Sequence, residues 1–140
     1  MPVLTDVALH LRMAGALLLC LAAAHVVLPR ALGWSVELQS VSLMTRQVSY
    51  VHTYFIGLLC ALFGLAGTLL ATDLLTSDRL ARAVLIGAIA AWGSRLLAEL
   101  CVFDSSLWRG NTLTVLGHVA FVLLWTYQTL VFTWALVLHL

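Results

Sequence analysis

The fold is decided by one continuous stretch: VSYVHTYFIGLLCALFGLAGTLLA at residues 48–71, TDLLTSDR at 72–79, and LARAVLIGAIAAWGSRLLAELCVF at 80–103. Each long segment has 24 largely apolar residues. At about 1.5 Å per residue, such a helix crosses the hydrocarbon core of a bilayer, which is about 30 Å thick. The short connection at 72–79 predicts that the two helices are antiparallel neighbours.

Two further spans are predicted on either side of this pair, at residues 13–28 and 113–138. An apolar stretch at 7–11 extends the first span toward the N-terminus. The apolar runs are continuous and do not alternate, which favours helices over the strands of a membrane barrel. The sequence therefore predicts an all-α fold, a four-helix antiparallel transmembrane bundle that forms a single domain over residues 1–140.

The start of the chain is also compatible with a signal peptide. Arg12, the apolar run from Met13 and the small residues Ala22-Ala23-Ala24 are typical of a cleaved leader. Pro29-Arg30, however, makes a suitable end for a retained helix. We expect the first span to be retained.

The composition excludes several classes of protein. Of 140 residues, 63% are apolar and 9% are charged, and the mean hydropathy is +1.07. Soluble domains are about 45–50% apolar and about 25% charged, so a soluble Rossmann, kinase or hydrolase domain is excluded. A net charge of +1 argues against a nucleic-acid partner. The partner that the composition implies is the lipid bilayer.

The arginines do not determine the membrane orientation, since four spans place both termini on one side. That side carries Arg12, Arg79 and Arg82, and the opposite side carries Arg30, Arg46 and Arg109. Three against three is a tie under the positive-inside rule. We expect cytoplasmic termini, because Arg12 precedes the first span and Arg79 and Arg82 lie beside a very short turn.

Each predicted span carries one costly polar residue at a similar depth, roughly 5–12 Å inside the same membrane interface. These residues are His25, His52, Glu99 and His118. Imidazole and carboxylate are ligands for transition metals such as Zn, Fe, Cu or Mn, and bundle cores often hold such sites. We therefore predict a metal or ligand site, with Arg95, Tyr50 and Tyr54 as residues that orient its members. The prediction rests on depth, because no local metal-binding motif is present.

Two other ligands fit the same residues. Two of the histidines could ligate a b-type haem lined by Phe55, Phe121 and Trp125. A quinone or lipid-headgroup pocket would need only a His or Tyr and an Arg, and Arg109 could bind a phosphate or carboxylate. Each feature also has a purely structural interpretation, because intramembrane histidines are often hydrogen-bonded framework residues and aromatic stripes often pack helices.

The third span carries a row of residues spaced by four: Ala83, Gly87, Ala91, Arg95 and Glu99. Small residues let a neighbouring helix approach closely, so we expect this row to face the bundle interior. Residues four apart on a helix can pair, which predicts an Arg95–Glu99 ion pair.

A second hypothesis for function treats the chain as a non-catalytic accessory subunit of a larger membrane complex, or as a homo-oligomer. The second span offers a stripe of small residues as the packing interface: Gly57, Ala61, Gly64 and Gly67. No recognised catalytic motif is present in the sequence, so catalytic residues stay unassigned and an enzymatic activity stays open.

Two stretches, TRQVSYVHT at 45–53 and LWRG at 107–110, resemble segments of small bacterial four-helix integral membrane proteins. The resemblance covers most of the chain. It implies the four-helix topology and a location in a bacterial inner membrane, and it transfers no functional residue.

Overall fold

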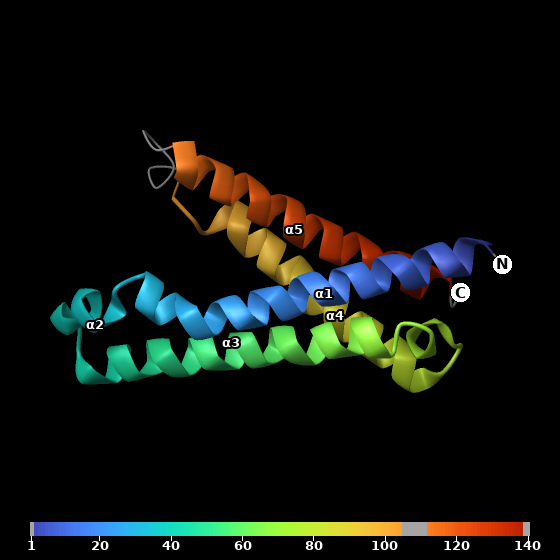
Figure 1. Cartoon of the computed structure of the whole chain (residues 1–140), viewed down its shortest axis with the longest axis horizontal. Helices are drawn as coiled ribbons and strands as arrows, with labels where there is room; N and C mark the ends of the chain where they lie inside the picture. Colours follow the sequence, from blue (N-terminus) through green and yellow to red (C-terminus); the bar gives the residue numbers. More distant parts are fainter. Residues whose placement is uncertain (1, 105–111, 139–140) are drawn as a thin grey trace. The chain divides into compact units, whose positions relative to one another are not determined.

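The computed structural model of the chain describes residues 2–104 and 112–138. Its helical elements, in chain order, are α1 (Pro2–Ala31), α2 (Trp34–Glu37), η1 (Leu38–Ser40), α3 (Leu43–Leu69), η2 (Asp73–Leu75), α4 (Arg79–Cys101) and α5 (Thr112–Val137) (Figure 1). No β-strand occurs in the described residues, and the predicted all-α class is confirmed.

Four of these helices are long and apolar enough to cross a membrane, as expected for a membrane protein. They are Val3–Ala31 within α1, and the whole of α3, α4 and α5. The first helix is longer than the predicted span 13–28, because Pro29 lies inside its last turn and the helix continues to Ala31. Proline removes one donor, and near a helix end this loss is small. The four-helix antiparallel bundle stays a prediction.

The chain divides into two compact units. The α1–α3 unit comprises Arg12–Leu70, and the α4–α5 unit comprises Met1–Leu11 together with Ala71–Leu140. The boundary between Leu11 and Arg12 lies within α1, so this helix contributes its first turns to one unit and its remainder to the other.

In the α1–α3 unit, α1 and α3 run side by side in opposite directions (Figure 1). Gly15 of α1 lies against the backbone of Gly64 and Thr68, and His25 lies against Gly57 further back along α3. A Cβ added at Gly15 would lie 2.6 Å from the Thr68 backbone nitrogen and 2.7 Å from the Gly64 oxygen. Only a glycine allows two helix backbones to approach this closely.

The link between these two helices contains short helical turns. Gly33 has φ of 61°, a left-handed conformation that glycine adopts at no steric cost, and it turns the chain out of α1. Ser42 then caps α3 by accepting a hydrogen bond from the Thr45 backbone N–H at 3.2 Å.

In the α4–α5 unit, α4 and α5 are also antiparallel, since Trp92 stacks on Trp125 while Glu99, further along α4, meets His118, earlier in α5. Asp78 caps α4 by accepting from the Leu80 N–H at 3.3 Å. Six apolar residues in the described part of this unit are completely buried: Val7, Leu11, Leu85, Ala88, Phe132 and Ala135.

The predicted inward-facing row on α4 is wrong at its N-terminal end. Ala83 and Gly87 are exposed, whereas Glu99 is buried. In a helix with 3.6 residues per turn, each four-residue step adds about 40° of rotation, so the row from Ala83 to Glu99 turns through about 160°. The buried face of α4 instead follows Ala81, Leu85, Ala88, Trp92 and Glu99.

The close approach at Gly15 generates a stability prediction. Gly15→Ala is expected to lower the free energy of unfolding by about 1–3 kcal/mol, because the added methyl meets rigid backbone atoms of α3. Gly117→Ala is the matched control, since nothing lies within 4 Å of a Cβ at Gly117. This control should be neutral or slightly stabilising, because alanine favours helix. Equal effects of the two variants in denaturant titrations of detergent-solubilised protein would contradict the proposed contact.

Candidate functional site

The residues predicted to form one site divide between the two units. The α1–α3 unit holds His25, His52, Tyr50 and Tyr54. The α4–α5 unit holds Glu99, His118 and Arg95. Arg109, the remaining predicted residue, lies outside the described residues.

The predicted metal site is not supported. Within residues 2–104 and 112–138, no group of three or more His, Cys, Asp or Glu side chains could hold a metal ion. The prediction used membrane depth as a measure of proximity, and a common depth places residues in one layer without bringing them to one point. Each predicted histidine instead uses its Nδ1 on a protein oxygen.

Glu99 is the buried charge of the α4–α5 unit, with 4% of its side chain exposed. Its Oε2 lies 2.9 Å from Nη1 of Arg95, one turn earlier on α4, which confirms the predicted ion pair. Its Oε1 accepts from Nδ1 of His118 on α5 at 2.9 Å. A carboxylate in an apolar region is costly unless it is paired and hydrogen-bonded. The two partners meet this requirement and link α4 to α5.

Aromatic rings surround the Arg95 guanidinium. Its central carbon lies 5.5 Å from the centroid of the Phe103 ring and 5.3 Å from that of Trp125, within cation–π range. Trp125 is in turn stacked against Trp92 and against Phe121, at centroid distances of 5.5 and 6.3 Å. Phe121 and Trp125, which were expected to line a haem, therefore pack against each other, and Trp125 also packs against Arg95.

His10 is a polar residue that the sequence analysis missed. Its Nδ1 lies 3.0 Å from the hydroxyl oxygen of Tyr127 on α5, and its ring lies 5.8 Å from that of Trp134. The first span was predicted over residues 13–28 with an extension at 7–11, and His10 within that extension was not recognised as a polar residue of the span. The apolar stretch at 7–11 was the signal that this helix begins earlier.

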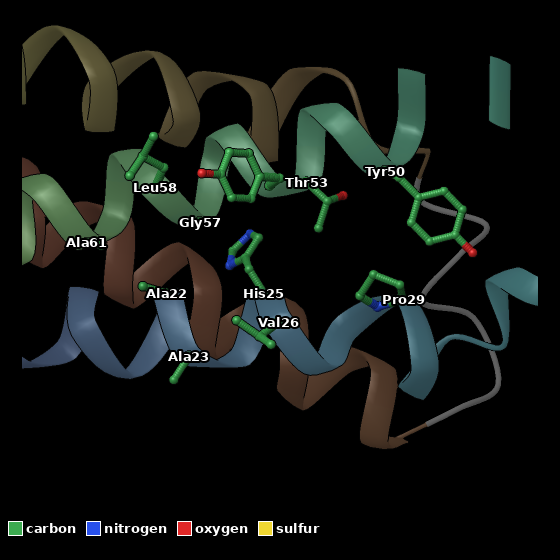
Figure 2. A pocket seen from close by; sticks show the side chains of 11 residues that line it. Ala22, Ala23, His25, Val26, Pro29, Tyr50, Thr53, Gly57, Leu58 and Ala61 are labelled. Carbon is green, nitrogen blue, oxygen red and sulfur yellow. The ribbon is translucent and has the colours of Figure 1, made fainter. Parts of the chain in front are cut away.

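The α1–α3 unit contains a groove of about 510 Å³ between its two long helices. From α1 it is lined by Ala22, Ala23, His25, Val26 and Pro29, and from α3 by Tyr50, Thr53, Tyr54, Gly57, Leu58 and Ala61. Most of this surface is apolar, and the polar groups are one imidazole and three hydroxyls. Figure 2 shows His25 extending from α1 toward α3 at the level of Gly57.

The hydrogen bonding of His25 fixes what its ring offers to the groove. Nδ1 lies 2.8 Å from the Leu21 carbonyl oxygen, four residues earlier on the same helix. A carbonyl only accepts, so Nδ1 carries a hydrogen, and in the neutral form of the ring Nε2 is an unprotonated acceptor. His52 has the same arrangement on α3, with Nδ1 3.0 Å from the Val48 carbonyl oxygen, but it does not line the groove.

Gly57 makes room for His25. A Cβ added at Gly57 would lie 3.0 Å from the His25 Cβ. Of the remaining stripe residues, Gly64 packs against Gly15 and Leu19, the backbone of Gly67 also meets Gly15, and Ala61 lines the groove. The stripe proposed as an interface with another protein therefore packs against α1 of the same chain.

Comparison of the chain with protein-family models, curated proteins and solved structures found no match.

The Glu99 ion pair generates a prediction that tests its energetic role. Glu99→Gln is expected to lower the free energy of unfolding by about 1–3 kcal/mol, because the Arg95 cation loses its counter-ion. This lies below the usual cost for a fully buried pair, since the Arg95 side chain is 36% exposed. Adding Arg95→Gln to Glu99→Gln should cost less than the sum of the single variants.

Asp73→Asn is the control for this experiment, because it removes a carboxylate at an exposed position of the same unit. It should change the free energy of unfolding by no more than about 0.5 kcal/mol. Strictly additive effects of Glu99→Gln and Arg95→Gln would show that the pair contributes no coupling.

Proposed function

We propose that this membrane protein binds a neutral small molecule from the lipid phase in the groove between α1 and α3. The supporting observation is the groove itself, with a single imidazole acceptor, that of His25, among largely apolar walls. Small-molecule sites have volumes of about 300–1,000 Å³, mostly apolar linings and a few polar groups that orient the ligand. A groove of about 510 Å³ falls within this range.

The location of the groove favours a ligand that arrives through the bilayer. Its lining residues belong to α1 and α3, two of the four helices that are long and apolar enough to span a membrane. None of the described lining residues carries a permanent charge, so an anionic phospholipid headgroup would lack a counter-ion there. A neutral molecule with an apolar body avoids this cost.

The size of the groove favours a small molecule over a helix of another protein. A helix about 10–12 Å wide that rises 1.5 Å per residue would fill this volume with about one turn. The stripe offered as the surface for an accessory subunit is also partly occupied, because Gly64 and Gly67 pack against α1 of the same chain.

Photolabelling with a long-chain alkyl diazirine tests the proposal in protein reconstituted into nanodiscs. We expect labelling of the groove to saturate with probe concentration and to concentrate on peptides from α1 and α3 that line it. Leu58→Trp should reduce this labelling several-fold, because Leu58 lines the groove and a larger side chain occupies it.

Leu59→Trp is the matched control. Leu59 is 40% exposed, compared with 39% for Leu58, and it does not line the groove. This variant should be labelled like the wild-type protein. Non-saturable labelling spread evenly over all lipid-facing helices, unchanged by Leu58→Trp, would overturn the proposal.

A further inference from the structure

The groove is asymmetric in its hydrogen-bonding capacity, because His25 contributes only an acceptor to it. With the hydrogen on Nδ1 held by the Leu21 carbonyl, the neutral ring has no N–H left to offer. Nε2 has no hydrogen-bond partner among the described residues. An acceptor without a partner in an apolar setting costs free energy, and a ligand that donates a hydrogen bond to it removes that cost.

Pro29, which also lines the groove, removes the usual donor to the backbone carbonyl of His25. In a regular helix the amide of residue 29 would donate to the carbonyl oxygen of His25, four residues earlier. Proline has no amide hydrogen, so this carbonyl lacks its usual donor.

The other polar groups of the groove do not oppose this preference. The hydroxyls of Tyr50, Thr53 and Tyr54 can donate or accept, so they can bind either kind of group. Among neutral molecules soluble in lipid, the common donor is a hydroxyl group. The chemistry of His25 thus selects a hydroxyl-bearing head.

Aromatic side chains favour a flat aromatic head over an aliphatic alcohol. The Tyr50 ring is held edge-to-face by Trp34 at a centroid distance of 5.5 Å, and the Tyr54 ring is held by Phe55 in the same way at 5.5 Å. Rings restrained by such pairs give a further ring a preorganised surface. The apolar residues Ala22, Val26 and Leu58 leave the rest of the groove for an alkyl tail.

Building on the proposed lipid-phase site, we infer that its ligand is a hydroquinone with an apolar tail, bound through a phenolic hydroxyl that donates to Nε2 of His25. The reduced form of the ligand is the donor. The corresponding quinone has only carbonyl acceptors, and it would face the acceptor of His25 without a hydrogen between them.

Competition against the diazirine label tests this inference under anaerobic conditions. The competitors are decylhydroquinone, its dimethyl ether and decylquinone, which share a tail and differ in their ability to donate. The hydroquinone is expected to compete about five- to ten-fold more tightly than the ether or the quinone, the difference that one hydrogen bond in an apolar site provides. This comparison uses the wild-type chain and needs no variant.

Two variants then assign the preference to His25. His25→Leu should remove the difference between hydroquinone and ether, while His25→Gln, which keeps a side-chain acceptor, should retain part of it. His52→Leu is the control, because His52 has the same bond to its own helix but lies outside the groove lining. It should leave the preference unchanged.

The possible failures are distinct. Saturable labelling with equal competition by hydroquinone and ether would overturn the hydroquinone inference and leave the lipid-phase site standing. Tighter competition by the quinone, or a preference lost in His52→Leu, would also overturn it. Absence of saturable labelling would overturn the proposed function, and the inference with it.

Discussion

In the hydrocarbon core of a bilayer a polar group has no water to bond with, so every donor, acceptor and charge in a spanning segment must find a partner in protein or ligand. This constraint makes helices the structure of the four apolar segments, because a helix pairs its own backbone groups. It also accounts for the side chains. The imidazoles of His25 and His52 donate back to carbonyls of their own helices, and Glu99 is ion-paired with Arg95 and hydrogen-bonded to His118.

The two units satisfy the constraint in different ways. In the α4–α5 unit, both carboxylate oxygens of Glu99 have a partner. The Arg95 guanidinium that pairs with Glu99 also packs against the Trp125 ring. The α1–α3 unit relies on backbone proximity, with Gly15 against Gly64, and it leaves the Nε2 of His25 without a partner in the described residues. For function, this unpaired acceptor is more informative than the paired Glu99, because a ligand in the groove can donate a hydrogen bond to it.

Much of the fold could be predicted from the sequence because hydropathy reports directly on membrane spanning. The helices α3, α4 and α5 were located to within a few residues, whereas α1 begins at Pro2, before the predicted extension at 7–11, and the role of His10 in that extension was missed. The Arg95–Glu99 pair followed from its four-residue spacing. The row from Ala83 to Glu99 failed because a four-residue repeat drifts around a helix of 3.6 residues per turn.

The candidate site was harder to predict, because depth in a membrane is one coordinate and a site needs three. The argument from membrane depth correctly placed Glu99 and His118 at the same level, and these two side chains are hydrogen-bonded. The same argument joined these residues to His25 and His52 as metal ligands, which the structure does not support. Nor does sequence spacing reveal that Gly57 admits the His25 ring or that α1 and α3 enclose a groove beside it.

The proposed function depends on which nitrogen of the His25 ring carries the hydrogen. Nitrogen-15 NMR of histidine-labelled protein in nanodiscs measures it directly, with the His25 signals assigned by their loss in His25→Gln. We expect a protonated Nδ1, a non-protonated Nε2, and a shift of the Nε2 resonance when decylhydroquinone is added. A hydrogen on Nε2 in the neutral ring, or an Nε2 resonance unmoved by saturating hydroquinone, would contradict it.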